Sequence, residues 1–253
     1  MNTINVTIKD RLALITLNRG KSNALNREMI TELTDMLHNI NNDANIGGVV
    51  ITGKEHFFSA GLDLIELYSY NEEEIRSFWK LFLDAIAKIV AFKKPMVAAI
   101  NGHSPAGGCI IALACDARVM AEGKYVIGLN EVPVGIIVPD SVFQLYAFWL
   151  GKAHASRSLL EGKLFSPEEA LNIGLIDEVV NPASIMTAAE RRIRKYMALE
   201  PNTWQQSKLN IRKELIAATS ADQSELLEIT LAQWWSPSSR NLLKMIIDSL
   251  QKK

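Results

Sequence analysis

Cysteine is scarce in this chain of 253 residues, which contains only Cys109 and Cys115. The two lie six positions apart in one uncharged stretch, and this favours reduced, buried thiols over a disulfide framework or a zinc site with four ligands. The N-terminal segment alternates like a strand and lacks the basic region and apolar run of a secretory signal. We therefore expect a cytoplasmic location and no bound metal.

An excess of charge of either sign is also missing. The chain carries 27 Lys and Arg against 28 Asp and Glu, a formal net charge of -1. Such a chain exerts no overall attraction on nucleic acid or on an acidic membrane surface, so an anionic ligand must be held by local groups. The balance argues against nucleic-acid and membrane partners and favours a small-molecule ligand.

An uninterrupted apolar segment that could cross a membrane is absent too. Residues 95–115 contain no Asp, Glu, Lys or Arg and are numerous enough to span a bilayer. They are interrupted, however, by the loop-forming sequence Asn-Gly-His-Ser-Pro at residues 101–105. We expect a buried strand, a loop and a buried helix here.

The chain does contain a recurring order of strands and helices. Residues 6–8 and 12–17 alternate as a β-hairpin, and a helical pattern follows Asn26, a good N-cap. Further on, short apolar strands alternate with helical patterns, and residues 117–122 and 124–129 predict a fourth pair of strands. This order predicts an α/β fold with right-handed layering and strands buried on both faces.

The last third of the chain changes character after a well-marked helix. Ser166 and Glu169 predict a capping box, with Pro167 at the first helical position and Gly174 ending the helix. Beyond about residue 182 strand patterns disappear. Residues 181–201, 202–219, 220–235 and 236–250 then each predict a capped helix.

These C-terminal helices carry more apolar surface than short helices can hide among themselves. Trp234 and Trp235 stand side by side, and apolar residues recur in the following helix at positions 242, 243, 246 and 247. The surface favours self-association, with an intramolecular core as the alternative.

Two glycine-containing loops follow predicted buried strands. The first reads FFSAGLDL at residues 57–64, and the second reads NGHSPAGGC at residues 101–109 and leads into the uncharged helix. Glycine lets backbone amides turn toward a ligand, and an amide at a helix N-terminus carries partial positive charge. One N–H from each loop could form a two-donor oxyanion hole that stabilises a thioester oxygen as it becomes an enolate.

Together with SNAL at residues 22–25 and GLNEVPVGIIVP at residues 128–139, these loops resemble the enoyl-CoA hydratase/isomerase (crotonase) superfamily over essentially the whole chain. The resemblance implies a spiral of strand-strand-helix repeats over residues 1–190 and a helical oligomerisation segment over residues 191–253. It also implies an acyl-CoA substrate, no separate cofactor because coenzyme A is part of the substrate, and a homotrimer or a dimer of trimers.

The resemblance also implies site residues. The amides of Ala60 and Gly107 would form the oxyanion hole. Residues 22–25 and 60–64 would hold the coenzyme A portion, and Asn130 would orient the neighbouring Glu131. The substrate-binding residues implied are Ser22, Ala24, Leu25, Ser59, Gly61, Leu62, Asp63, Leu64 and Asn130.

The residue after Cys109 distinguishes between reactions. Hydratases of the family have a glutamate there and a second one further along, whereas this chain has Ile110 and keeps only Glu131. A single carboxylate in an apolar wall suits a proton shuttle from C2 to C4 of a 3-enoyl thioester, and partial burial should raise its pKa. The chain thus resembles the Δ3,Δ2-enoyl-CoA isomerases, which act in fatty acid β-oxidation.

Two other interpretations stay open. One is a hydratase that uses Glu131 alone. The other is a noncatalytic homologue that binds acyl-CoA or RNA, and the neutral net charge argues against RNA binding. We assign no catalysis to His103. A turn role is favoured for Asp63, and the basic residues 191–195 are expected to form a solvated helix face.

Overall fold

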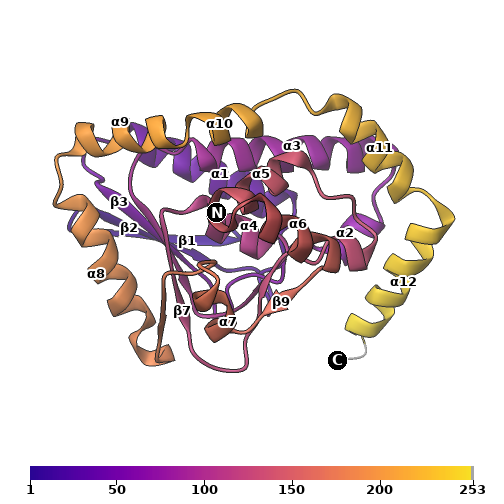
Figure 1. The fold of residues 1–253 in the computed structure, drawn as a ribbon, viewed down its shortest axis with the longest axis horizontal. Coiled ribbons are helices and arrows are strands. Elements are labelled where there is room, and N and C mark those ends of the chain that lie inside the picture. Colours follow the sequence, from indigo (N-terminus) through magenta and orange to yellow (C-terminus); the bar gives the residue numbers. More distant parts are fainter. Residues whose placement is uncertain (252–253) are drawn as a thin grey trace.

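A six-stranded sheet with helices on both faces forms the centre of the computed structural model, which describes residues 1–251 (Figure 1). Its strands run in the order β1 (Ile4–Lys9), β2 (Leu12–Leu17), β3 (Gly48–Thr52), β5 (Met96–Ile100), β7 (Ala117–Ala121) and β10 (Glu178–Val180). β1 and β2 form the predicted antiparallel hairpin, and the other neighbours are parallel. Every residue of β3, β5 and β7 is buried, which confirms the expected α/β class with strands covered on both faces.

A second, smaller sheet contains β4 (His56–Phe57), β6 (Gly102–Pro105), β8 (Ile127–Gly128) and β9 (Leu164–Phe165), in that order. Each of β3, β5 and β7 is followed along the chain by a strand of this sheet, so the strand-strand-helix order recurs. The fourth pair of strands, predicted over residues 117–122 and 124–129, is present as β7 and the shorter β8. The two join different sheets, because β8 hydrogen-bonds to β6 and β9.

The helices divide between the two faces of the larger sheet. Those of the first 184 residues are α1 (Arg27–Asn42), α2 (Leu64–Tyr68), α3 (Glu72–Val90), α4 (Gly107–Ala114), α5 (Asp140–Leu150), α6 (Lys152–Glu161) and α7 (Pro167–Asn172), with the 3-10 turns η1 (Val132–Val134) and η2 (Pro182–Ser184). α1, α3 and α4 belong to the larger apolar core, whereas α8 (Ile185–Met197) covers the opposite face of β3, β5 and β7. None of the described helices is long and apolar enough to cross a bilayer, and residues 95–115 contain β5, β6 and α4 as expected.

The predicted helix caps are confirmed. The side chain of Asn26 accepts a hydrogen bond from the Met29 amide at 3.0 Å, which caps α1. Ser166 and Glu169 form the reciprocal capping box of α7. Gly174 follows that helix with φ at +77°, a conformation that favours glycine.

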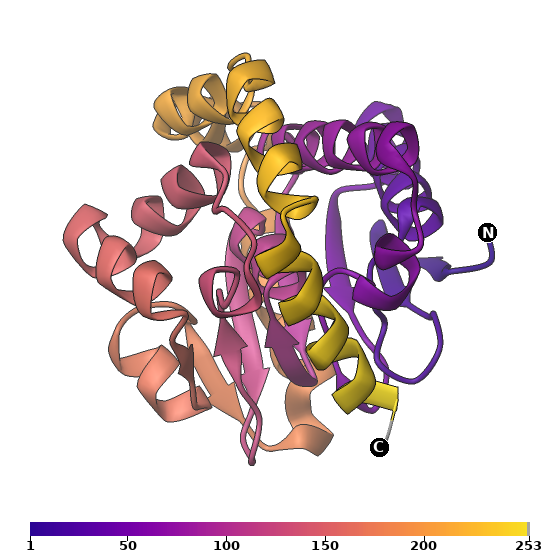
Figure 2. The ribbon, with the colours of Figure 1, turned by 90° about the vertical axis from the view of Figure 1, so that its right-hand side faces the viewer.

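The C-terminal part is helical in the described residues, as predicted, but its helices are shorter. α8 is followed by α9 (Pro201–Ile211), α10 (Lys213–Thr219), α11 (Ser224–Trp234) and α12 (Pro237–Gln251). One helix was predicted over residues 202–219, and the chain instead breaks at Arg212. Figures 1 and 2 show α9 and α10 lying along α3, and α12 running away from them along one side of the molecule.

Much of the apolar surface on these helices is covered within the chain. Trp234 is buried and its ring lies 6.4 Å from that of Trp79 on α3. Leu243 and Ile247 of α12 are buried as well. Packing within the chain therefore accounts for the burial of these side chains. Self-association, and a boundary at residue 190 between the core and an oligomerisation segment, stay predictions.

A buried ionic cluster fastens α9 and α10 to the core. Asp116 lies 2.8 Å from Nζ of Lys208 and 3.0 Å from the guanidinium of Arg212. Arg212 also donates to the carbonyls of Ala114 and Cys115, which fixes the chain at the break between α9 and α10. Burial lowers the pKa of Lys208 to about 8 despite the adjacent carboxylate.

Removing the acid of this cluster should destabilise the fold. In the Asp116→Ala variant two buried cations lose their counter-charge, and we expect the free energy of unfolding to fall by about 3–5 kcal/mol in urea titrations. The control is Glu228→Ala, which removes an exposed ion pair with Arg76 and should leave the unfolding midpoint almost unchanged. Equal small effects of the two substitutions would contradict the structural role of the cluster.

Candidate functional site

A cavity of about 90 Å³ lies where the second sheet meets α3, α4 and α5. We call it the acid cavity, because Glu131 is the only ionisable side chain among the described residues that line it. The lining residues are Ala60, Leu62, Leu64, Trp79, Phe82, Pro105, Ala106, Gly107, Ile110, Asn130, Glu131, Val134, Ile136, Pro139 and Val142. The sequence predicted a single carboxylate in an apolar wall, and Asn130 is the one other polar side chain in the lining that the structure describes.

Strand pairing in the smaller sheet brings the two glycine loops together. β4 and β6 are parallel and in register, with His56 opposite Gly102 and Phe57 opposite His103. The loops that leave these strands therefore run side by side. Gly61 has φ at +84°, and a Cβ there would lie only 2.8 Å from Cβ of Ala106, so the close approach requires glycine at this position.

Gly107 provides one amide at this junction. It is the first residue of α4, and the N–H groups of a first helical turn have no acceptor within the helix. The helix dipole adds partial positive charge at the same end. Such an amide suits an anionic oxygen, and the donor role that the resemblance implies for Gly107 stays a prediction.

In the first loop the free amide is that of Leu62 rather than that of Ala60, the residue implied by the resemblance. The Ala60 amide donates to the carbonyl of Ser22 at 2.9 Å and is therefore engaged. Gly61 and Asp63 bond to Leu25 in a parallel bridge, so the N–H of Leu62 points away from Leu25. Among the described residues it has no acceptor, and its nitrogen lies 3.6 Å from where a Cβ on Gly107 would be.

Glu131 lies at the start of η1, and its side chain is buried in the cavity. Its backbone carbonyl accepts hydrogen bonds from the amides of Val134 and Ile136, which hold this turn in place. Burial raises the pKa of the carboxyl to about 7, in the direction that the sequence predicted. Its Oε2 atom has no hydrogen-bond partner within the described structure. The carboxylate is therefore free to exchange a proton with a ligand.

Ile110 closes the wall at the position where a second acid could have stood. It is buried in α4 directly after Cys109, which is also buried and packs as a small apolar residue. Glu131 is consequently the one carboxyl group in the described lining of the acid cavity. The side chain of Ile110 is apolar and cannot hold a water molecule as a second carboxylate would.

Several predicted ligand-binding residues lie around the cavity rather than in its lining. The hydroxyl of Ser59 donates to Asn23 O and accepts from the Gly61 amide, so it braces the first loop. Asp63 caps α2 and forms an ion pair with Arg19 at 2.7 Å, a structural role that agrees with the turn predicted for it. The residues outside the lining are Ser22, Ala24, Leu25, Ser59, Gly61 and Asp63, whereas Leu62, Leu64 and Asn130 line it.

The sequence resemblance predicts that residues 64–82 line or cover a tunnel for the acyl chain, and Leu64, Trp79 and Phe82 of this segment do line the cavity. Sequence reasoning missed Val142 of α5. Helical spacing marks it as buried but not as cavity-lining, because that depends on how α5 packs against α4. The described residues contain no cluster of three or more metal-ligating side chains.

Comparison with known proteins is consistent with this geometry. The family described as enoyl-CoA hydratase/isomerase matches residues 7–245. The chain is 36% identical to mitochondrial enoyl-CoA delta isomerase 1 of Mus musculus over 248 residues, which cover 96% of this chain and 84% of the mouse protein. It is 31% identical to short-chain-enoyl-CoA hydratase of Clostridium acetobutylicum over 215 residues, 84% and 82% of the two chains.

A solved structure extends the similarity to the fold. The crystal structure of human mitochondrial delta3-delta2-enoyl-CoA isomerase superimposes with a TM-score of 0.95 at 30% identity, covering 99% of this chain and 98% of the human one. The expected cytoplasmic location is corrected by these relatives, because the mouse, rat and human isomerases are mitochondrial. Unpaired, buried cysteines are compatible with either compartment and could not have distinguished them.

The raised pKa of Glu131 should make the stability of the protein depend on pH. A carboxyl whose pKa rises from 4.5 when unfolded to about 7 when folded holds its proton more tightly in the folded state. The stability this contributes is complete below pH 4.5 and is lost as the pH rises through 7. The Glu131→Gln variant has no carboxyl group to ionise at this position. Its free energy of unfolding should therefore increase relative to that of the parent protein as the pH rises, by about 3 kcal/mol above neutrality.

Urea titrations from pH 4 to pH 8 measure this difference. The control is Glu168→Gln on the exposed start of α7, which should show no such trend. A constant difference between Glu131→Gln and the parent protein across the range would show that the Glu131 carboxyl titrates normally.

Proposed function

The chain belongs to the enoyl-CoA hydratase/isomerase family, and we propose that it isomerises 3-enoyl-CoA thioesters to 2-trans-enoyl-CoA thioesters. One observation carries the proposal: a single buried carboxylate with an unpaired oxygen shares the lining of the acid cavity with Leu62, Gly107 and apolar Ile110. Such a site can move one proton from C2 to C4 of the acyl chain but has no second acid to activate water. The reaction places the protein in the oxidation of unsaturated fatty acids.

The proposed reaction is a proton transfer in two steps through one base. The Glu131 carboxylate takes a proton from C2, and the electron pair of the broken C–H bond delocalises through C1 onto the thioester oxygen. The carbonyl then re-forms, a double bond forms between C2 and C3, and the electrons of the C3–C4 double bond take the proton from Glu131 at C4. A pKa of about 7 lets the same group accept and return the proton near neutral pH.

The oxyanion of this dienolate needs two donors, and we assign them to the amides of Leu62 and Gly107. The free Leu62 amide and the position of Gly107 at the start of α4 support this pair over Ala60 and Gly107. Loss of one such donor typically raises the barrier by about 2.7–4 kcal/mol. Apolar walls keep water from the dienolate and strengthen these interactions.

The coenzyme A portion of the substrate would lie along residues 22–25 and 60–64. These two segments run together, because Leu25 bridges to Leu62 and the Ser22 carbonyl binds the Ala60 amide. Asn130, next to the acid in the cavity lining, would orient Glu131. The proposal requires no separate cofactor.

Assembly into a homotrimer or a dimer of trimers is part of the proposal, with residues 191–253 as the oligomerisation segment. Exposed apolar side chains on this segment support it, namely Leu199, Ile211, Ile229, Met245 and Leu250. They need a partner surface that the helices themselves do not provide.

Substitution of the acid tests the mechanism. Glu131→Gln keeps the size of the side chain but removes the base, so turnover of 3-hexenoyl-CoA should fall by about two to four orders of magnitude, with coenzyme A affinity unchanged. The conjugated product is followed by its ultraviolet absorption. Glu168→Gln should retain full activity, and near-normal turnover by Glu131→Gln would refute the assignment.

The hydratase alternative, supported by the similarity to the Clostridium enzyme, is tested in the same assay. The parent protein is given 2-hexenoyl-CoA, and loss of absorption reports hydration. We expect isomerisation of the 3-enoyl thioester to be much faster than hydration of the 2-enoyl thioester. The opposite order would identify a hydratase, and binding without either reaction would identify a noncatalytic member.

A further inference from the structure

The side chain of Arg19 joins two segments that border the acid cavity. Its Nη1 atom donates hydrogen bonds to the Ala24 carbonyl at 3.0 Å and to the Asp63 carboxylate at 2.7 Å. Its Nη2 atom donates to the Glu66 carboxylate at 2.8 Å. Ala24 and Asp63 lie in the two segments proposed to hold coenzyme A, and Glu66 lies in the first turn of α2. One guanidinium therefore holds three pieces of the chain together.

The backbone at Arg19 is anchored as well. The Arg19 amide donates to Oδ1 of Asn23, and the Asn23 amide donates to the Arg19 carbonyl, both at 3.0 Å. Asn23 is buried, and its Nδ2 atom donates to the carbonyls of Phe57 and Phe58 at 3.2 Å. The turn that carries Arg19 is thus attached to the end of β4, where the first glycine loop begins.

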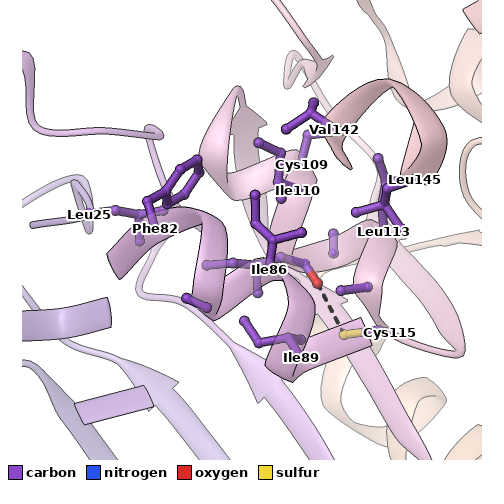
Figure 3. Close-up of a cluster of buried hydrophobic side chains, with 14 of the residues drawn as sticks. Leu25, Phe82, Ile86, Ile89, Cys109, Ile110, Leu113, Cys115, Val142 and Leu145 are labelled. Atoms are coloured by element: carbon purple, nitrogen blue, oxygen red, sulfur yellow. Dashed lines mark hydrogen bonds between the residues drawn. The ribbon is translucent and has the colours of Figure 1, made fainter. Parts of the chain in front are cut away.

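Leu62, whose amide is free, lies between two residues that are bonded to Leu25. The Leu25 amide donates to the Gly61 carbonyl at 2.8 Å, and the Asp63 amide donates to the Leu25 carbonyl at 2.9 Å. Leu25 is itself held by the core, and Figure 3 shows it in one apolar cluster with Phe82. The direction of the Leu62 N–H therefore depends on where Gly61 and Asp63 are held.

The contacts of Arg19 require the forked shape of a guanidinium. Two different nitrogen atoms bond to the carboxylates of Asp63 and Glu66, whereas the ammonium group of a lysine has a single nitrogen with which to reach them. The side chain of Arg19 is 25% exposed and that of Asp63 is 14% exposed, so water competes less for this ion pair than for one on the surface. A lysine at this position would keep the charge but lose part of the geometry.

We propose that Arg19 is a positioning residue for the oxyanion hole, because it holds Asp63 and thereby aims the Leu62 amide at the thioester oxygen. The inference rests on the proposed function, which assigns that amide as one of the two donors. A donor displaced by about 1 Å can cost roughly a hundredfold in rate. The bound substrate should lose much less, because its thioester oxygen carries less charge than the oxygen of the dienolate.

Two single variants and their combination separate positioning from folding. Arg19→Lys keeps the positive charge but not the fork. Asp63→Asn removes the other member of the ion pair, and asparagine remains a good N-cap for α2. Because the pair is proposed to act as a unit, the double variant should be no more impaired than the worse single variant, within roughly threefold. The control is Arg76→Lys, which makes the same change in the exposed ion pair with Glu228.

Turnover of 3-hexenoyl-CoA and binding of hexanoyl-CoA give the first readout. We expect kcat to fall roughly tenfold or more in Arg19→Lys and in Asp63→Asn, while the dissociation constant of hexanoyl-CoA changes by less than about threefold. Arg76→Lys should match the parent protein in both measurements. Unchanged kcat in the two single variants, or losses that multiply in the double variant, would overturn the proposal. Asp63→Asn tests it alone should Arg19→Lys not fold.

An infrared measurement gives a second readout that needs no turnover. Hexanoyl-CoA with an isotope label on its carbonyl carbon is bound to each protein, and two donors on the thioester oxygen should lower the frequency of its C=O stretch. We expect the full lowering in the parent protein and in Arg76→Lys, and a smaller one in Arg19→Lys and in Asp63→Asn. A lowering that depends on Arg19 in a protein without isomerase turnover would support the positioning role and refute the proposed function. Turnover by the parent protein, with equal kcat and equal band positions in all variants, would do the reverse.

Discussion

The proposed chemistry depends on keeping one carboxyl group out of water. Glu131 is only 7% exposed, and its Oε2 atom has no partner among the described residues. A buried carboxyl without a counter-charge favours its neutral form, and this is why the pKa rises toward the pH at which a group can both take and return a proton. A neighbouring arginine or lysine would lower that pKa again, and the acid cavity contains neither.

The rest of the fold holds this group and its opposing amides in place. β4 and β6 bring the two glycine loops together, and the turn that carries Glu131 is braced from outside by α12. Gly135, with φ at +79°, ends that turn, and a Cβ on it would lie 3.1 Å from the side chain of Leu242. The C-terminal helix α12 thus supports the site directly. The buried cluster around Asp116 fastens α9 and α10 to the core beside β5 and β7.

Sequence alone could predict the parts of the structure that local chemistry determines. The hairpin, the cap at Asn26 and the capping box at Ser166 follow from short-range patterns. The candidate residues Gly107 and Glu131 come instead from the resemblance to the enoyl-CoA hydratase/isomerase family. No local pattern marks the break at Arg212, whose side chain is held by an aspartate almost a hundred residues earlier. Likewise the Ala60 amide is engaged by Ser22 and the Leu62 amide is left free by the bridge to Leu25, contacts that no local pattern contains.

The pH dependence of kcat/KM for 3-hexenoyl-CoA tests the central claim most directly, since it reports the pKa of the base in the free enzyme. The base must be ionised to take the C2 proton, so activity should rise with pH and level off above an apparent pKa of about 7, the value that burial gives Glu131. A profile that is already level from pH 5 upward would show that the carboxyl ionises as it does in water. The buried acid would then not be the group that limits the reaction.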